Sequence, residues 1–181
     1  MSTFSAFDAA TLSLGLLIGR LVLGGLMAAH GTQKLFGWFG GHGLNGTAGF
    51  FEQIGFRPGR FFAVTAAATE LTGGVLLALG LLSPVASALM ISVMVVAMGS
   101  VHWKNGLFAA TNGIEVPFLY AVGALALGFT GPGAWSLDAA FGLTPLWTPA
   151  LVAVILGLGV VGGFANLALR RTAPAAAQAA R

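Results

Sequence analysis

The sequence predicts an all-α, polytopic transmembrane bundle of five helices with one short interfacial helix. Of its 181 residues, 57% are apolar and only 7% are Asp, Glu, Lys or Arg, whereas a typical soluble domain has about 25% charged residues. The apolar residues gather into five segments near the length of about 20 residues that crosses roughly 30 Å of hydrocarbon. Helices are required because an open sheet leaves unpaired backbone groups in lipid.

The predicted spans follow one another with short connections, and they cover residues 12–29, 61–82, 84–101, 116–129 and 146–169. Pro84 and Pro117 each fit the first turn of a helix, where the missing N–H costs nothing. The second and third spans are joined so closely that they must form a tight antiparallel hairpin. We treat 1–172 as a single transmembrane domain and expect the alanine-rich tail 173–181 to be disordered.

The long connection after the first span contains the predicted interfacial helix. A turn-rich aromatic stretch over 37–43 suits the headgroup region of a membrane. After it, Leu44, Ala48 and Phe51 recur at helical spacing. We therefore expect a short amphipathic helix lying on one face of the membrane.

Basic residues predict the orientation of the chain. With five spans, all seven Lys and Arg outside the spans fall on one side, and none falls on the other: Lys34, Arg57, Arg60, Lys104, Arg170, Arg171 and Arg181. The positive-inside rule then places the N-terminus outside and the C-terminus in the cytoplasm. We expect a bacterial-type inner (plasma) membrane.

Composition excludes several classes of chemistry. The chain has no cysteine, which rules out disulfides, thiolate metal sites and iron–sulfur clusters supplied by this chain. No basic stretch interleaved with aromatic residues indicates nucleic-acid binding. Redox activity would therefore need a bound cofactor or a partner protein.

Two ionisable residues lie inside predicted spans. Arg20 is in the first and Glu70 in the second, and such groups need a partner or water in a membrane. Counted at 1.5 Å per residue, they lie about 12 Å and about 18 Å from the same edge, so the sequence predicts a buried Arg20–Glu70 pair. Either the pair only fixes how the helices pack, or it forms a substrate- or proton-linked site. Small residues on the same faces of both helices indicate close packing there.

Further polar residues collect at the predicted cytoplasmic ends of the helices. This cytoplasmic polar cluster consists of His30, Lys34, His102, Asn112 and Glu115. One interpretation is that these residues anchor helix ends at the interface; the other is a shallow pocket for a headgroup or a quinone ring. We predict no metal site, because no second ligand stands at ligand spacing within a helix.

Four stretches of the sequence resemble motifs of the DoxX family of small membrane proteins. The first helix carries Gly19-Arg20-Leu21 and the run from His30 to Gly37, and the second carries Glu70-Leu71-Thr72-Gly73-Gly74. The third is Asn112-Gly113-Ile114-Glu115 before a proline, and the fourth joins Gly131-Pro132-Gly133 to Ser136-Leu137-Asp138. The resemblance covers about 12–140 and implies a four-helix core, to which 146–169 adds a fifth, C-terminal span.

The resemblance also implies a function. Some DoxX relatives are associated with membrane oxidoreductase complexes that act on oxidative stress, and many others have no assigned activity. The chain is accordingly expected to be a small subunit of a redox or stress-protective assembly. As an accessory subunit it is expected to bind quinone rather than haem. Its expected partners are membrane lipids, an oxidoreductase and, as a homo-oligomer, further copies of itself. The resemblance assigns no catalytic residue. A transporter or channel for a small solute or lipid, and a non-catalytic scaffold, are the alternatives.

Overall fold

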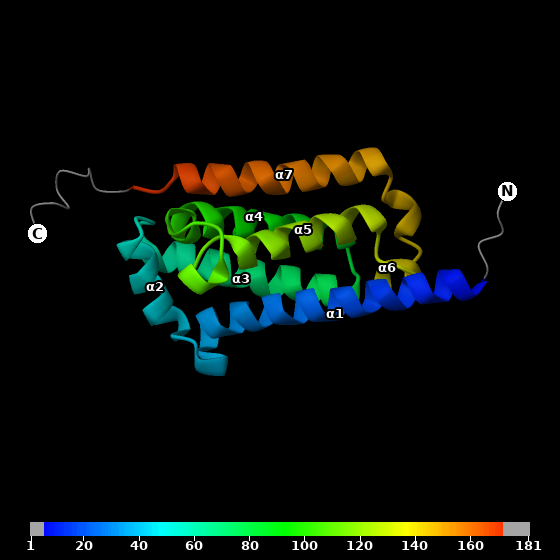
Figure 1. The fold of residues 1–181 in the computed structure, drawn as a ribbon, viewed down its shortest axis with the longest axis horizontal. Coiled ribbons are helices and arrows are strands. Elements are labelled where there is room, and N and C mark those ends of the chain that lie inside the picture. The colour runs from blue at the N-terminus through cyan, green and yellow to red at the C-terminus, as the bar shows by residue number, and fades with distance from the viewer. Residues whose placement is uncertain (1–5, 172–181) are drawn as a thin grey trace, which may run out of the picture.

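Five apolar helices lie side by side in the computed structural model, which describes residues 6–171, and each runs opposite to the one before it in the chain (Figure 1). All regular structure within that range is helical. The long helices are α1 (Ala6–Phe36), α3 (Gly59–Leu79), α4 (Ser83–Ala97), α5 (Glu115–Thr130) and α7 (Pro149–Ala168). Two short helices, α2 (Gly43–Gln53) and α6 (Leu137–Ala140), connect them at opposite ends of the bundle. The prediction of an all-α bundle is confirmed.

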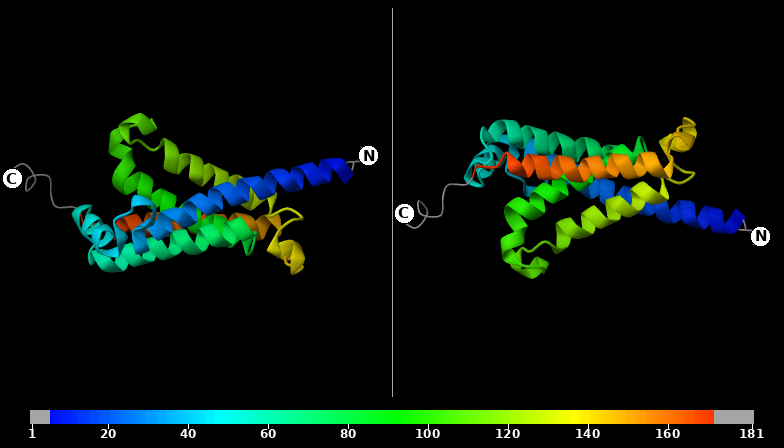
Figure 2. Two further views of the ribbon diagram at one scale, coloured as in Figure 1. Left: turned by 90° about the horizontal axis from the view of Figure 1, so that it is seen from below. Right: turned by 90° about the horizontal axis from the view of Figure 1, so that it is seen from above.

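Four of these helices are long and apolar enough to cross a membrane, if α4 is continued through the π-helical turn Met98–His102 and the 3₁₀ turn Trp103–Asn105. The predicted fourth span corresponds to α5, whose 16 residues cover only about 24 Å. It nevertheless returns the chain from one end of the bundle to the other (Figure 1). The first helix is much longer than predicted, and its N-terminal turns extend beyond the other helices (Figure 2).

Glycines set the distance between α1 and α3. A Cβ added at Gly24 would lie 2.5 Å from the carbonyl oxygen of Gly74, and one at Gly31 would lie 2.6 Å from the backbone nitrogen of Leu71. Only glycine permits such close backbone contact, which is how helices gain packing energy in lipid. The predicted close packing of small residues between the two helices is confirmed. We call these contacts of Gly24, Gly31 and Gly74 the seam, and they fix which residues of α1 lie beside which residues of α3.

The predicted interfacial helix is present as α2, which lies across one end of the bundle (Figure 1). Phe51 of α2 packs with Phe56 and with Phe62 and Ala63 of α3 in a small aromatic cluster. The outer faces of α1 and α7 expose many large apolar side chains, including Leu12, Ile18 and Phe164. Such a surface needs lipid around it.

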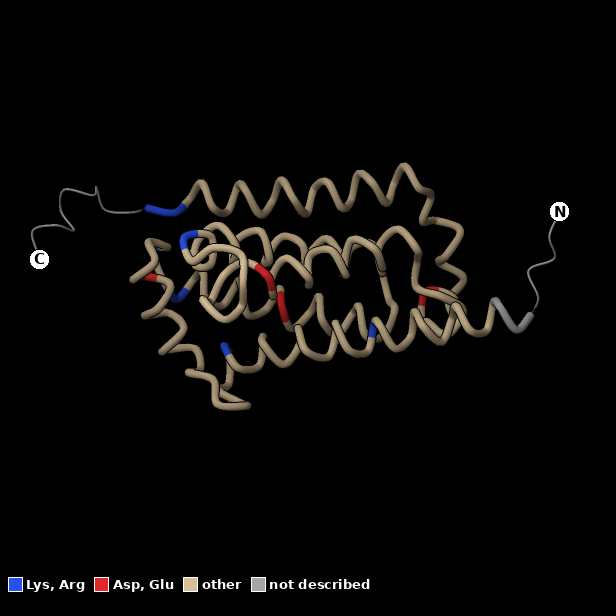
Figure 3. Tube along the Cα trace, viewed as in Figure 1, with Lys and Arg blue, Asp and Glu red and all other residues tan. Residues whose placement is uncertain are grey.

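Charged residues are distributed unevenly along the bundle. Figure 3 shows most Lys and Arg gathered at one end, where α1 and α7 finish, with one further basic position on α1 toward the other end. We call the first end, formed by α2, the α4–α5 connection and the C-terminus of α7, the cationic end. We call the opposite end, which contains α6, the Asp138 end. The predicted disorder of 173–181 lies outside the described residues.

Candidate functional site: a polar cavity at the cationic end

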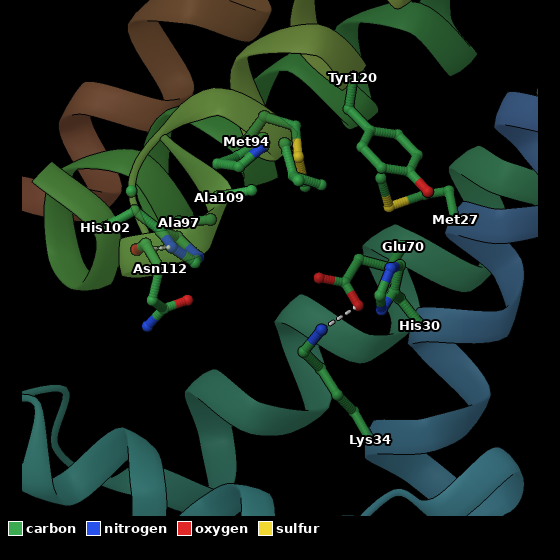
Figure 4. A pocket seen from close by; sticks show the side chains of 13 residues that line it. Met27, His30, Lys34, Glu70, Met94, Ala97, His102, Ala109, Asn112 and Tyr120 are labelled. Atoms are coloured by element: carbon green, nitrogen blue, oxygen red, sulfur yellow. Dashed lines mark hydrogen bonds and ion pairs between the residues drawn. The ribbon is translucent and has the colours of Figure 1, made fainter. Parts of the chain in front are cut away.

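A cavity of about 310 Å³ opens between α1 and the α4–α5 hairpin at the cationic end. The connection between α4 and α5 projects away from the other helices there (Figure 2). One wall carries Met27, His30, Lys34 and Glu70, and the facing wall carries Met94, His102 and Asn112, with Tyr120 beside them (Figure 4). The cavity therefore combines apolar walls with a small number of convergent polar groups, as ligand sites usually do.

An ion pair joins the α1 and α3 walls of this cavity. The Lys34 ammonium lies 2.5 Å from a Glu70 carboxylate oxygen (Figure 4). The Glu70 side chain is 7% exposed and that of Lys34 is 28% exposed. The Glu70 carboxylate is thus largely shielded from water and contacts the Lys34 ammonium at the wall of the cavity.

The predicted Arg20–Glu70 pair is therefore wrong. The glycine contacts place Gly31 level with Ala67 and Leu71, so Glu70 is level with the end of α1 and not with its middle. Arg20 lies about 11 residues, or about 16 Å, away along that helix. Counting depth from the first apolar residue failed because α1 begins earlier and extends beyond its neighbours.

Arg20 instead belongs to the Asp138 end. Its side chain is 1% exposed, and its guanidinium donates hydrogen bonds to the backbone oxygens of Ala78 (3.2 Å) and Trp135 (2.6 Å). The negative charge of Asp138 also acts on it. Arg20 thus connects α1 to the end of α3 and to the connection before α6.

Asp138 is the buried charge that the sequence interpretation did not single out. It is fully buried and accepts hydrogen bonds from the backbone N–H groups of Leu82 (2.7 Å) and Ser83 (2.9 Å) at the start of α4. It also accepts one from the indole N–H of Trp147 (3.0 Å). A carboxylate at a helix N-terminus is favourable. The signal in the sequence was an acidic residue in the Ser136-Leu137-Asp138 motif.

His102 is presented to the cavity by an irregular end of α4. The π-helical turn Met98–His102 widens the helix, a feature often found at functional sites. The His102 Nδ1 atom lies 2.8 Å from the backbone oxygen of Asn112. This contact uses only one ring nitrogen, and the other has no hydrogen-bond partner within residues 6–171 and is available to a ligand.

Asn112 and Glu115 shape the connection between α4 and α5, which supplies the backbone oxygen bonded to His102. Asn112 adopts a left-handed conformation with φ of 60°, and a Cβ on Gly113 would collide with the backbone of Leu107. The Glu115 carboxylate accepts a hydrogen bond from the Ala109 N–H at 2.7 Å. Asn112 lines the cavity, whereas Glu115 does not. The structure therefore separates Glu115 from the predicted cluster and gives it a role in closing the loop.

His30 shares its side of the cavity with a residue that the sequence analysis missed. Its Nδ1 atom lies 3.1 Å from the Gln33 side-chain oxygen, and its ring meets the Tyr120 ring edge-on at 6.2 Å. Tyr120 is the single tyrosine of the chain. Among the described residues, neither its hydroxyl nor the Asn112 side-chain amide has a hydrogen-bond partner, so both are available to a ligand.

Two further cavities border the same ion pair. One of about 280 Å³ extends between α3 and α7 and shares Lys34, Glu70 and His102 with the first. Another of about 270 Å³ lies beside the turn at Gly40 and Gly41 and also includes Lys34. Lys34 thus borders all three. Within residues 6–171 there is no group of three or more His, Cys, Asp or Glu side chains that could hold a metal ion.

The fold and the cavity define a multi-pass helical membrane protein with a polar, ligand-sized cavity at one end of the bundle. The sequence model of the DoxX family matches residues 15–103. This match confirms the resemblance to the DoxX family over these residues. No curated protein and no solved structure matches the chain.

The matched segment runs from α1 to the turn after α4 and supplies most of the cavity. His30, Lys34, Glu70 and His102 lie within it, while Asn112 and Tyr120 lie beyond it. The motifs at 112–115 and 131–138, which also resembled the family, are outside the match. The role of Asp138 is therefore argued from its hydrogen bonds in this structure and not from the family match.

Proposed function

We propose that this protein is a small accessory subunit of a membrane redox or oxidative-stress-protective assembly, and that the polar cavity binds the ring of a quinone. The observation that carries the proposal is the set of unused hydrogen-bonding groups in the cavity. The Tyr120 hydroxyl, the Asn112 amide and one nitrogen each of His30 and His102 have no protein partner among the described residues. A quinone ring has two carbonyl oxygens that accept such hydrogen bonds.

The size and walls of the cavity support a ring rather than a whole lipid. Its volume of about 310 Å³ is at the lower end of the range for small-molecule sites, about 300–1,000 Å³. Met27 and Met94 supply soft apolar contact, and methionine packs favourably against aromatic rings. The polar groups converge from three directions, which favours a flat molecule with acceptors at opposite edges.

The same proposal includes a partner protein and a membrane. The chain contains no cysteine and no metal-holding group within residues 6–171, so the electrons for reducing a bound quinone would come from an oxidoreductase partner. The concentration of Lys and Arg at the cationic end supports a cytoplasmic location for that end and an outside N-terminus in a bacterial-type inner membrane.

Transport of a small solute is the competing function, and one observation favours it. Lys34 borders three cavities, and intramembrane ionisable groups often mark a pathway. Solute flux into liposomes that is abolished in Glu70→Gln would support transport and count against a quinone site. Equal flux in wild-type, variant and empty liposomes would remove this alternative.

A quinone titration tests the proposal directly. The protein is placed in phosphatidylcholine nanodiscs and titrated with a short-chain ubiquinone analogue, and quenching of tryptophan fluorescence is measured. We expect saturable binding at one site per chain. Replacing His102 by Ala or Tyr120 by Phe should each weaken binding about tenfold, the effect of losing about 1.4 kcal/mol of hydrogen bonding.

Arg60→Gln is the matched control, because Arg60 lies at the same end but is bonded to Asn45 and does not line the cavity. It should bind the analogue like the wild type. Quenching that rises linearly with quinone in all variants would mean partitioning into lipid and would overturn the proposal.

A further inference from the structure

The second cavity, about 280 Å³ in volume, has walls suited to a hydrocarbon chain. Phe50, Phe51 and Phe62 line one side, and Val93 and Val96 of α4 line its floor. Three of the four hydroxyls along it are bonded to backbone oxygens, while that of Ser92 has no hydrogen-bond partner among the described residues. Those of Thr65, Thr69 and Ser100 donate to the carbonyls of Phe61, Thr65 and Val96 in their own helices, which leaves methyl and methylene groups facing the cavity.

A cation is fixed at the mouth of this cavity. The Arg170 Nε atom donates a hydrogen bond of 2.5 Å to the backbone oxygen of Ile54, which itself lines the cavity. Arg171 holds the same connection through its backbone N–H and the Gly55 oxygen at 2.8 Å. Asn166 of α7 lines the cavity, and Arg170 follows two residues after the end of this helix at Ala168.

Within residues 6–171, no carboxylate forms an ion pair with the charge at this mouth. Among the described residues, the single ion pair is Lys34–Glu70. The nearby carboxylate of Glu52 accepts a hydrogen bond from the Gly59 N–H instead. Apart from the bond through Nε, the N–H groups of the Arg170 guanidinium have no partner within residues 6–171. They form a planar fork of the kind that binds phosphate.

We propose that this second cavity is a binding site for an anionic phospholipid. One acyl chain lies along Phe50, Phe62 and Val96, and the phosphate is held by Arg170 with the Asn166 amide beside it. Basic positions at the cytoplasmic ends of membrane helices favour anionic lipid headgroups. The volume is smaller than a drug-sized site, so the cavity holds part of one chain, and the rest of the lipid stays in the bilayer.

This site is separate from the proposed quinone site. The Lys34–Glu70 pair stands between the two cavities, since both residues line each of them. A hydrocarbon chain does not favour crossing an ion pair, so the two occupants are different molecules. Failure of the lipid experiment leaves the quinone titration unaffected, and the reverse is also true.

The test counts lipids retained by the intact protein. The protein is purified in detergent with equal amounts of phosphatidylglycerol and phosphatidylcholine of identical chains, and native mass spectrometry measures each bound lipid. We expect one phosphatidylglycerol retained in preference to phosphatidylcholine. Arg170→Gln should reduce that preference about fivefold, the effect of about 1 kcal/mol per basic residue. Lys104→Gln, an equal charge change at the same end outside the cavity, should leave it unchanged.

A second pair of variants fills the space without touching the charge. Thr65 is exposed and lines the cavity, whereas its neighbour Val64 is exposed and does not. Thr65→Phe should abolish retention of the lipid, and Val64→Phe should not. Equal loss in both, equal retention of the two lipids by the wild type, or equal loss in Lys104→Gln and Arg170→Gln would each overturn the proposal.

Discussion

The two ends of the bundle each contain a buried or half-buried ionic cluster, but they are built differently. At the Asp138 end, Arg20 is 1% exposed and Asp138 is fully buried. Both are bonded to backbone groups, and Asp138 also accepts a hydrogen bond from the Trp147 indole. At the cationic end, Lys34 is 28% exposed and borders three cavities. The first cluster is enclosed by the protein, although the Arg20 Nε and Ser83 Oγ atoms are buried without a hydrogen-bond partner among the described residues, whereas the second cluster faces cavities.

This difference indicates a division of labour between the ends. Enclosed groups that are bonded to several helices hold those helices in place and lie out of the reach of a ligand. Polar groups that face a cavity can bind a ligand. Leaving them without protein partners costs stability, which the Asp138 end must offset. Ionisable residues within a membrane are therefore not one class, and their surroundings decide whether they serve the fold or a ligand.

The largest expected effect is at Asp138. Asp138→Ala removes the acceptor for two N–H groups of α4 and for Trp147 and leaves Arg20 without its nearest negative charge. We expect a loss of about 3–5 kcal/mol in the free energy of unfolding, as for other broken buried charge clusters. Unfolding in mixed micelles measures it.

Glu52→Ala is the comparison, because that carboxylate accepts a single backbone hydrogen bond from Gly59. It should cost about 1 kcal/mol. If the two variants unfold alike, the Asp138 end has no special structural role.

A smaller effect on stability is expected at the glycine contacts that fix the offset between α1 and α3. A Cβ at Gly74 would collide with the backbone of Ala28, while one at Gly25 meets nothing within 4 Å. Gly74→Val should destabilise the protein by about 1–3 kcal/mol through overpacking, and Gly25→Val should be nearly neutral. Thermal unfolding of the two variants side by side tests this, and equal stability would contradict the seam.

At the cationic end, we expect function to suffer more than stability. Glu70→Gln removes the charge of the ion pair but keeps the shape of the side chain. It should cost about 1–2 kcal/mol in the free energy of unfolding, while the Kd for the quinone analogue rises at least tenfold. If Glu70→Gln loses much stability but binds the quinone analogue normally, the cationic end serves the fold rather than a ligand, which contradicts the proposal.

The smallest loss of stability is expected at Trp147. Trp147→Phe removes one hydrogen bond to Asp138 and should cost about 1 kcal/mol. Trp135 is the control, because its ring is 51% exposed and only its backbone oxygen contacts Arg20. Trp135→Phe should therefore leave the unfolding temperature unchanged, and an equal fall in both would indicate a general effect of losing an indole.

Much of the candidate site could be predicted from the residue types alone. His30, Lys34, His102 and Asn112 were expected at one level because each follows or ends an apolar segment, and all four line the cavity. Tyr120 and Glu70 were not placed there, because each lies inside an apolar helix and its neighbours come from other helices. Glu115 was expected in the same cluster, but it does not line the cavity, and its carboxylate bonds to the loop that precedes it.

The sequence by itself determined the class of protein, the helices and the unequal distribution of charge between the two ends. These follow from composition and local pattern, because a long apolar segment must be helical in lipid. Only the tertiary structure decided which charges meet. The pairing of Lys34 with Glu70, and of Arg20 with the Asp138 end, depends on the offset between α1 and α3. That offset is set by backbone contact at Gly24, Gly31 and Gly74, which residue counting along either helix does not contain.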